Sequence, residues 1–304
     1  MRLTVQLKLL PTPQQADALR RTLETANAVC NAISQVAWKT QTFRQFPLHR
    51  LTYRSVRKTF PLSAQVVVRC IAKVAEAYQH DTNTKPVFKP HGSVAYDDRI
   101  LSFALSDALV SIWTLEGRQT IPFICGDRQQ MLLAYRRGET DLVFSNGSWY
   151  LYASCEVQTP QPFEAEGVLG VDLGVTNIAT DSDGEVYSGK AMKNVRHRHR
   201  RLRQKLQRKG TLGARRRLKK LSGKERRFAT YVNHCLSKRM VAKAECTKRA
   251  IALEDLTHIR TRMKACRSQR ATLHSWSFAQ LQGRRPSPRA FIAYKAVLKG
   301  VPVH

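Results

Sequence analysis

Residues Gly167–Gly174 form an apolar run that contains a single acidic residue, Asp172. A run of valine, leucine and glycine of this length predicts a buried strand. A carboxylate inside such a strand costs free energy unless it is paired or binds a metal ion. Taken alone, Asp172 is equally compatible with a strand-end residue that caps a turn.

A second apolar run, Arg249–Leu256, also closes on an acid, Glu254. Two acids at the ends of two strands in a strongly basic chain indicate a carboxylate pair for phosphodiester chemistry. Two divalent ions about 4 Å apart activate water and stabilise the leaving oxygen, and such hard cations prefer carboxylate oxygens. We therefore predict that Asp172 and Glu254 are catalytic residues and bind Mg²⁺.

The net charge of +30 arises from 52 basic and 22 acidic side chains. Such an excess repels itself in an enzyme of small metabolites, but it suits a polyanion, because each cation at a phosphate releases a counterion. An anionic membrane surface is the alternative. No run approaches the roughly 20 apolar residues of a membrane span, and the N-terminus is a poor signal peptide. We expect a cytoplasmic protein with no membrane partner.

Between Lys190 and Arg227 the only acid is Glu225. At helical spacing the cations cover most faces, whereas a solvated, salt-bridged helix would alternate in sign. Contact with nucleic-acid phosphates is the better interpretation. The candidate nucleic-acid-binding residues are Lys193, Arg196, Arg198, Arg200, Arg201, Arg203, Lys205, Arg208, Lys209, Arg215, Arg216, Arg217, Lys219 and Lys220.

The N-terminal half alternates strand and helix signals. Residues Arg2–Leu9 alternate apolar and polar, which predicts a half-buried strand. A capping signal at Thr12 begins a helix that runs to about Lys39, and a second helix is predicted over Ser63–His80. Short apolar runs follow, among them a strand near Thr120–Ile124. The pair Asn146-Gly147 predicts a β-hairpin.

The C-terminal half begins after a proline-containing linker, Gln158–Pro162. The predicted elements are strands over 167–174, 177–180 and 185–187, a basic helical region from about 192 to 248, an apolar strand over 249–256, and helices over 275–282 and 290–299. The seven cysteines are scattered and none is spaced C-x-x-C, so we expect free thiols rather than disulfides or a zinc ribbon.

Several of these segments resemble the TnpB, or OrfB, proteins of bacterial insertion sequences. The first RuvC motif of that family resembles residues 170–180 with the turn at 182–184, and the second resembles 251–256. The family's N-terminus resembles 9–15, and the region after the second motif resembles 275–281 and 294–303. The resemblance covers nearly the whole chain in the family's order.

The resemblance implies an α+β and α/β fold. Residues 1–11 and 81–160 would form a wedge-like β-barrel domain, interrupted by a helical recognition insertion over 12–80. Residues 166–304 would form an RNase H-like (RuvC) domain with a basic helical segment over 190–248. In that fold the first strand lies beside the fourth, so Asp172 and Glu254 would face each other on adjacent parallel strands. Family members, like type V CRISPR effectors, bind a guide RNA and cut matched DNA.

The family pattern continues with a C-x-x-C zinc ribbon and a third RuvC motif that carries another aspartate. From Leu256 to His304 this sequence has no Asp or Glu. We therefore expect an incomplete RuvC domain without its zinc ribbon or third metal ligand. Asp172 and Glu254 would then repel each other. We expect neither Asp181 nor Asp183 to substitute for the missing ligand, and Asp255 to point to the opposite face.

Three functions compete. The first is an insertion-sequence-encoded, transposase-associated protein of the TnpB type, an RNA-guided, metal-dependent DNA endonuclease impaired by the missing carboxylate. The second is a non-catalytic protein that binds RNA and DNA, a guided repressor or a decayed remnant. The third is a basic ribosome-associated protein, which explains the charge but leaves Asp172 and Glu254 unexplained.

Overall fold

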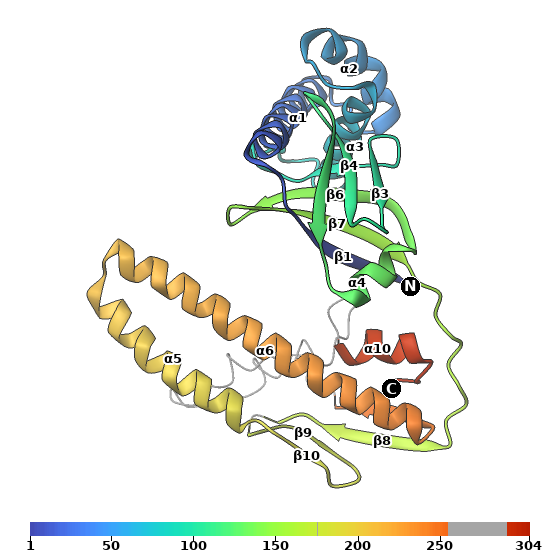
Figure 1. Ribbon diagram of the computed structural model, residues 1–304, viewed down its shortest axis with the longest axis vertical. Coiled ribbons are helices and arrows are strands. Elements are labelled where there is room, and N and C mark those ends of the chain that lie inside the picture. Colours follow the sequence, from blue (N-terminus) through green and yellow to red (C-terminus); the bar gives the residue numbers. More distant parts are fainter. Residues whose placement is uncertain (175, 255–290) are drawn as a thin grey trace. The chain divides into compact units, whose positions relative to one another are not determined.

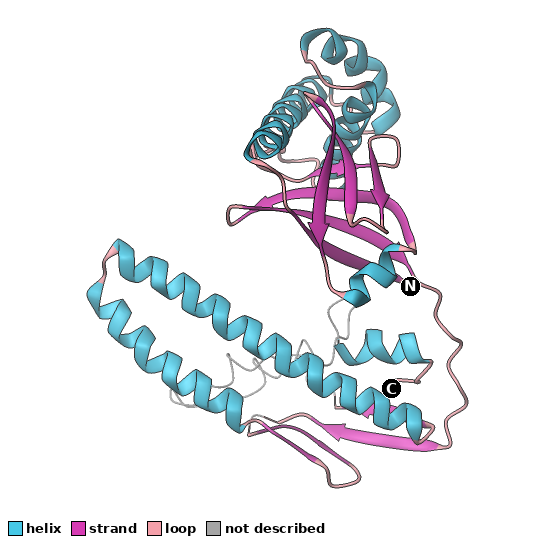
Figure 2. Ribbon diagram, viewed as in Figure 1, coloured by secondary structure: helices cyan, strands magenta, loops and turns pink. Residues whose placement is uncertain are grey.

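A computed structural model describes residues 1–174, 176–254 and 291–304. The chain divides into two compact units, Met1–Val157 and Gln158–His304, and each contains both helices and strands (Figures 1 and 2). This confirms the predicted mixed α and β fold class. The predicted helix over 275–282 and the predicted orientation of Asp255 lie outside the described residues.

The first unit is built on one antiparallel sheet that bends into a nearly closed barrel (Figure 2). Its seven strands follow the order β2-β6-β7-β1-β5-β4-β3. Their bounds are β1 (Arg2–Leu9), β2 (Val94–Tyr96), β3 (Leu101–Ala104), β4 (Leu109–Thr114), β5 (Gly117–Ile124), β6 (Arg136–Ser145) and β7 (Ser148–Glu156).

The predicted hairpin is present between β6 and β7. Asn146 and Gly147 form its turn, with φ angles of 52° and 76°. Positive φ at both central residues is what a type I′ hairpin turn requires, and asparagine and glycine tolerate it best. The long strand β7 then pairs with β1 along its whole length, from Arg2 opposite Glu156 to Leu9 opposite Trp149.

Three helices lie between β1 and β2 in the chain, and a short one lies between β5 and β6. They are α1 (Pro13–Thr40), α2 (Gln45–Thr59), α3 (Ala64–His80) and α4 (Asp127–Leu133). The predicted capping box of α1 is confirmed, because the Thr12 side chain accepts from the Gln15 backbone and the Gln15 side chain accepts in return. Ser63 caps α3 with a single hydrogen bond, which its hydroxyl oxygen accepts from the Val66 backbone N–H. Helix α2 was not predicted from the sequence.

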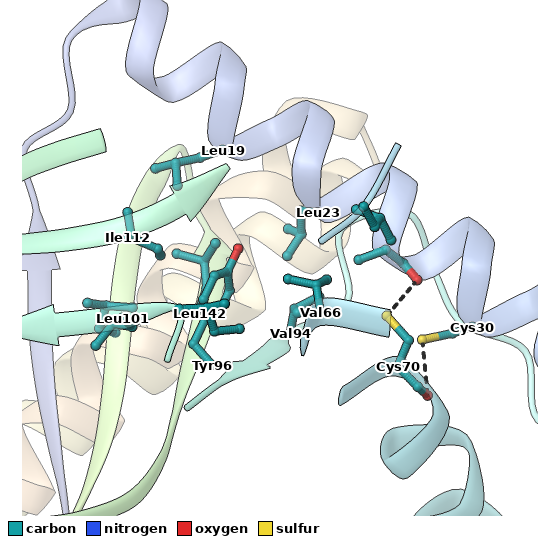
Figure 3. Close-up of a cluster of buried hydrophobic side chains, with 14 of the residues drawn as sticks. Leu19, Leu23, Cys30, Val66, Cys70, Val94, Tyr96, Leu101, Ile112 and Leu142 are labelled. Carbon is teal, nitrogen blue, oxygen red and sulfur yellow. Dashed lines mark hydrogen bonds between the residues drawn. The ribbon is translucent and has the colours of Figure 1, made fainter. Parts of the chain in front are cut away.

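The core of the first unit joins α1 and α3 to the sheet (Figure 3). Leu19 and Leu23 of α1 and Val66 of α3 are fully buried, as are Ile112 and Leu142 from the strands. Because one apolar cluster holds the helices and both ends of the sheet, the helical insertion and the barrel form a single packed body.

The cysteines of the described residues are all free thiols. Cys30 and Cys70 are buried where α1 meets α3, and their thiols donate to the backbone oxygens of Cys70 and Ala26, respectively (Figure 3). The prediction of free thiols is confirmed for these residues.

Polar side chains on one face of α1 hold an extended segment that follows α3. The Asn27 amide donates to the carbonyl oxygens of Pro90 and Gly92 at 3.1 and 2.8 Å, and its oxygen accepts from Lys73 at 2.9 Å. One turn further along, Asn31 exchanges two hydrogen bonds of 2.8 Å with the backbone of Phe88. These amides replace the strand partners that the extended segment lacks.

Replacing Asn27 with alanine is expected to destabilise the first unit by roughly 2 to 3 kcal/mol. The change leaves two partly buried carbonyl oxygens without their donor and removes one of the two acceptors of the Lys73 ammonium. Each unsatisfied group costs about 1 to 3 kcal/mol. Urea unfolding followed by circular dichroism measures the loss. Asn83→Ala, at an exposed position, is the control. A loss no larger than that of the control would show that the amide contacts do not stabilise the fold.

The second unit contains a four-stranded sheet of order β10-β9-β8-β11. Its strands are β8 (Gly167–Asp172), β9 (Asn177–Asp181), β10 (Val186–Ser188) and β11 (Arg249–Leu253), so the strands predicted here are confirmed. β8 and β11 are parallel, and the other pairs are antiparallel. The backbone at Val303 pairs in parallel with Ile251 of β11 and so extends the sheet beyond it.

The helices of the second unit are α5 (Lys190–Lys209), α6 (Leu212–Cys246) and α10 (Phe291–Lys299). Leu236, Met240 and Val241 of α6 pack with Ile292 of α10 against the sheet. The basic region predicted as one helical stretch is divided, because Gly210 adopts a left-handed conformation (φ 63°) that ends α5, and Thr211 caps α6. The two helices lie side by side as a hairpin (Figure 1).

Among the helices that the structure describes, none combines the length and the apolar character that a membrane span needs.

Candidate functional site: a carboxylate pair and two basic surfaces

The parallel pairing of β8 and β11 brings the two predicted carboxylates together. Their register runs from Arg249 opposite Gly167 to Leu253 opposite Val171. The residues that follow this last pair are Glu254 and Asp172, which therefore lie at the same level of neighbouring strands. The adjacency expected from the family resemblance is present in the structure.

Both carboxylates point away from the helix-covered face of the sheet. Val171 is buried in the core beneath α6, and the partly buried Leu253 packs against that core. Because side chains alternate along a strand, Asp172 and Glu254 project from the other face, and both are exposed. The expectation of a buried aspartate is therefore wrong: the strand is buried on one face, and Asp172 stands at its end on the open face.

The proximity of the two carboxyl groups changes their acid–base chemistry. Desolvation raises the pKa of Glu254, and a hydrogen bond shared with Asp172 and the repulsion between the two groups raise it further. These effects favour a proton on Glu254 when nothing else offsets the negative charge. A bound cation would compete with that proton for the same oxygens.

No basic side chain in the described ranges pairs with Asp172 or Glu254. Five other acids of the same unit do have basic partners: Asp181, Asp183, Glu185, Glu225 and Glu245. In a chain with a surplus of cations, two adjacent carboxylates without a partner form a site suited to an external cation.

Three acids at the turn between β9 and β10 form an ionic network on the opposite side of the sheet. Lys243 of α6 donates to Asp181 at 2.5 Å and lies 2.9 Å from Asp183 and 3.3 Å from Glu185. Arg249 of β11 makes a two-pronged contact with Asp183, at 2.8 and 2.6 Å. Neither Asp181 nor Asp183 was expected to join the carboxylate pair, and both pair with cations instead.

The network lowers the pKa of two of its acids. Burial acts to raise the pKa of Asp181, but hydrogen bonds from Lys243 and from the backbone of Glu185 and Asp183 outweigh it, and the pKa falls below its usual range. Hydrogen bonds from Arg249 and Lys243 lower the pKa of Asp183. The same contacts with Asp181 and Asp183 raise the pKa of Lys243. The network therefore stays ionised at neutral pH.

The first basic surface is the hairpin of α5 and α6. Two of the predicted nucleic-acid-binding residues, Arg196 and Arg203, are half-buried. Arg203 pairs with Glu225 of α6 at 2.6 Å, and burial lowers the pKa of Arg196. The other predicted residues are exposed along the hairpin: Lys193, Arg198, Arg200, Arg201, Lys205, Arg208, Lys209, Arg215, Arg216, Arg217, Lys219 and Lys220.

A second basic surface, not predicted from the sequence, lies on α2. This helix buries only Leu48, Thr52 and Val56, at a spacing of four residues. Its other faces and its N-terminus expose Arg44, Arg50, Arg54, Arg57 and Lys58. None of these forms an ion pair with an acid among the described residues. One signal could have found the surface: the sequence has no Asp or Glu from Thr25 to Ala75.

Comparison with known protein families finds a match that lies mainly in the second unit. Residues 152–258 match the sequence profile of the OrfB_IS605 family, described as "Probable transposase". This match confirms the family predicted from the sequence for that segment, which contains Asp172, Glu254 and the basic hairpin. No curated protein matches the chain.

The fold also has a solved counterpart. A chain in the cryo-EM structure of the Cas12f1–sgRNA–target DNA complex superposes with a TM-score of 0.62 at 12% sequence identity. The match covers 96% of this chain and 73% of that one. At this identity the likeness concerns the fold alone.

Replacing Lys243 with methionine is expected to lower the melting temperature at pH 7 more than at pH 3. The folded state lowers the pKa of Asp181 and Asp183, so their stabilisation is present above the ordinary carboxyl pKa of about 3.9. It is lost as the pH falls from there through their folded values. Thermal unfolding at both pH values tests this, with Lys238→Met on the exposed side of α6 as control. An equal deficit at both pH values would mean that Lys243 acts by packing alone.

Proposed function

We propose that this protein is a transposase-associated nuclease of the TnpB type, which binds a guide RNA and hydrolyses phosphodiester bonds of matched DNA with the help of Mg²⁺. The observation that carries the proposal is the pair formed by Asp172 and Glu254. They are adjacent, exposed and without a basic partner in the described part of a chain with a net charge of +30.

The donor set fits a hard divalent cation. Carboxylate oxygens are the ligands that Mg²⁺ prefers, and the two neighbouring carboxylates concentrate negative charge that a cation relieves. When bound, Mg²⁺ supplies activation of water and stabilisation of the leaving oxygen. Asp172 and Glu254 hold the cation at the open face of the sheet, where a nucleic-acid backbone has access.

The two basic surfaces fit the proposed partners. Exposed cations along the α5–α6 hairpin and on α2 supply phosphate contacts that fix the position of a nucleic acid without reading its bases. Phe46 of α2 is 81% exposed, and an exposed ring beside arginines suits stacking on an unpaired base. The solved relative named above is a complex with guide RNA and target DNA, which supports the same class of partner here.

A second function, binding of RNA and DNA without cleavage, is favoured by the small number of acidic ligands at the site. Among residues 1–174, 176–254 and 291–304 no group of three His, Cys, Asp or Glu side chains could hold a metal ion. Two carboxylates bind Mg²⁺ more weakly than three, so the cleavage rate is expected to be low. If the chain does not cleave DNA, its activity is the binding of RNA and DNA by the two basic surfaces.

Cleavage of a matched plasmid distinguishes the two functions. The chain is co-expressed with its flanking DNA, purified with its bound RNA and incubated with the plasmid and Mg²⁺. As an endonuclease it cuts slowly, and Asp172→Asn abolishes cutting because the cation loses a charged ligand. Asp107→Asn, at an exposed position in the first unit, is the control. Bound RNA with no cutting by the unmodified chain would reject the nuclease and support the binding protein.

Neutralising either basic surface is expected to weaken nucleic-acid binding and its salt dependence. On duplex DNA the slope of log K against log salt falls by about 0.9 for each lost phosphate contact. The triple variant Arg50→Gln, Arg54→Gln, Arg57→Gln tests α2, and Arg215→Gln, Arg216→Gln, Arg217→Gln tests the hairpin. Arg20→Gln with Arg21→Gln is the control, because both arginines already pair with acids. An unchanged slope in a triple variant would exclude that surface from the interface.

A further inference from the structure

A third oxygen-bearing side chain lies in line with the two carboxylates. In the antiparallel pairing of β8 and β9, Thr180 is directly opposite Asp172. In the parallel pairing on the other side of β8, Glu254 reaches the same level as Asp172. Thr180, Asp172 and Glu254 therefore form a row across three neighbouring strands.

The row lies on one face of the sheet and lines one open cleft. Residues directly opposite each other on an antiparallel pair share a face, and their Cβ atoms are about 5 Å apart. Thr180 is half-buried, whereas both carboxylates are exposed. The wall of the cleft contains all three residues together with Gly170, Ser182 and Ala252. Gly170 has no side chain and Ala252 only a methyl group, so neither of these described neighbours covers the row.

The residue after Thr180 is held on the other face. Asp181 lies opposite Val171, its side chain is fully buried, and it pairs with Lys243 of α6. This contact fixes which side chains of β9 point towards α6 and which point into the cleft, because a strand shifted by one residue would exchange its two faces. The ionic network thus holds Thr180 beside Asp172.

A threonine at this position has chemistry that a third acid lacks. Its hydroxyl adds no negative charge beside the two adjacent carboxylates, which repel each other when both are ionised. It can donate a hydrogen bond to a carboxylate, and its oxygen can accept one from a metal-bound water. Such neighbouring groups orient metal ligands, and their loss typically weakens metal affinity by 10- to 100-fold.

We propose that Thr180 is a positioning residue of the divalent-cation site, whose hydroxyl orients the Asp172 carboxylate and the water of the bound cation. The inference rests on the proposed function, because it requires that Asp172 and Glu254 bind the cation. Thr180 is then the residue that β9 contributes to the site, because the acid of this strand, Asp181, pairs with Lys243 on the other face.

Binding of Mn²⁺ to the full chain, followed by electron paramagnetic resonance, tests the proposal without any cleavage assay. Thr180→Val removes the hydroxyl and keeps the shape, and we expect Mn²⁺ affinity to fall by about tenfold. Thr180→Ser keeps the hydroxyl and is expected to retain most of the affinity. Thr4→Val, at an exposed position of β1, is the control. Should Thr180→Val fail to fold by circular dichroism, Thr180→Ala gives the same comparison.

Asp172→Asn separates the two possible failures. If it abolishes Mn²⁺ binding while Thr180→Val and Thr180→Ala both bind as tightly as the unmodified chain, the role of Thr180 is rejected and the metal site stands. Equal losses in the valine and serine variants would also reject it, because the hydroxyl would then be irrelevant. If Asp172→Asn itself binds Mn²⁺ normally, the proposed function fails and the inference fails with it.

Discussion

The parallel pairing of β8 with β11 is the contact on which the candidate site depends. The chain leaves β8, completes a small antiparallel sheet, runs out and back along the α5–α6 hairpin, and returns as β11 beside its starting strand. A shift of one residue in this register would send Glu254 to the helix-covered face and separate it from Asp172. The core beneath α6 opposes such a shift, because Val171 and Ile251 are both buried in it.

The acids of the second unit lie on two different faces of its sheet. On the α6 side, Asp181, Asp183 and Glu185 are neutralised by cations of α6 and β11. On the other side, Asp172 and Glu254 stand together without a partner from the described chain. The first arrangement stabilises the fold and orients β9. The second leaves a concentration of negative charge that an external cation can relieve, and the surrounding excess of positive charge draws a polyanion towards it.

Much of this arrangement could be predicted from the sequence. Capping at Thr12, the Asn146-Gly147 turn and the apolar strand runs are local signals, and the structure confirms them. The exposure of Asp172 could not be read from its neighbours, because an apolar run does not reveal which face of its strand is covered. Helix α2 was missed because it buries only three residues, so its apolar periodicity is weak. The position of Thr180 depends on cross-strand register, which no local pattern encodes.

The most direct test of the account is to locate a bound cation. Crystals of the chain grown with Mn²⁺ and measured at a wavelength where manganese scatters anomalously would show where the ion lies. The account predicts an anomalous peak between the carboxylates of Asp172 and Glu254, on the face of the sheet opposite α6. No peak there, with the two carboxyl groups within hydrogen-bond distance of each other at saturating Mn²⁺, would mean that they share a proton instead of a metal ion and would contradict the central claim.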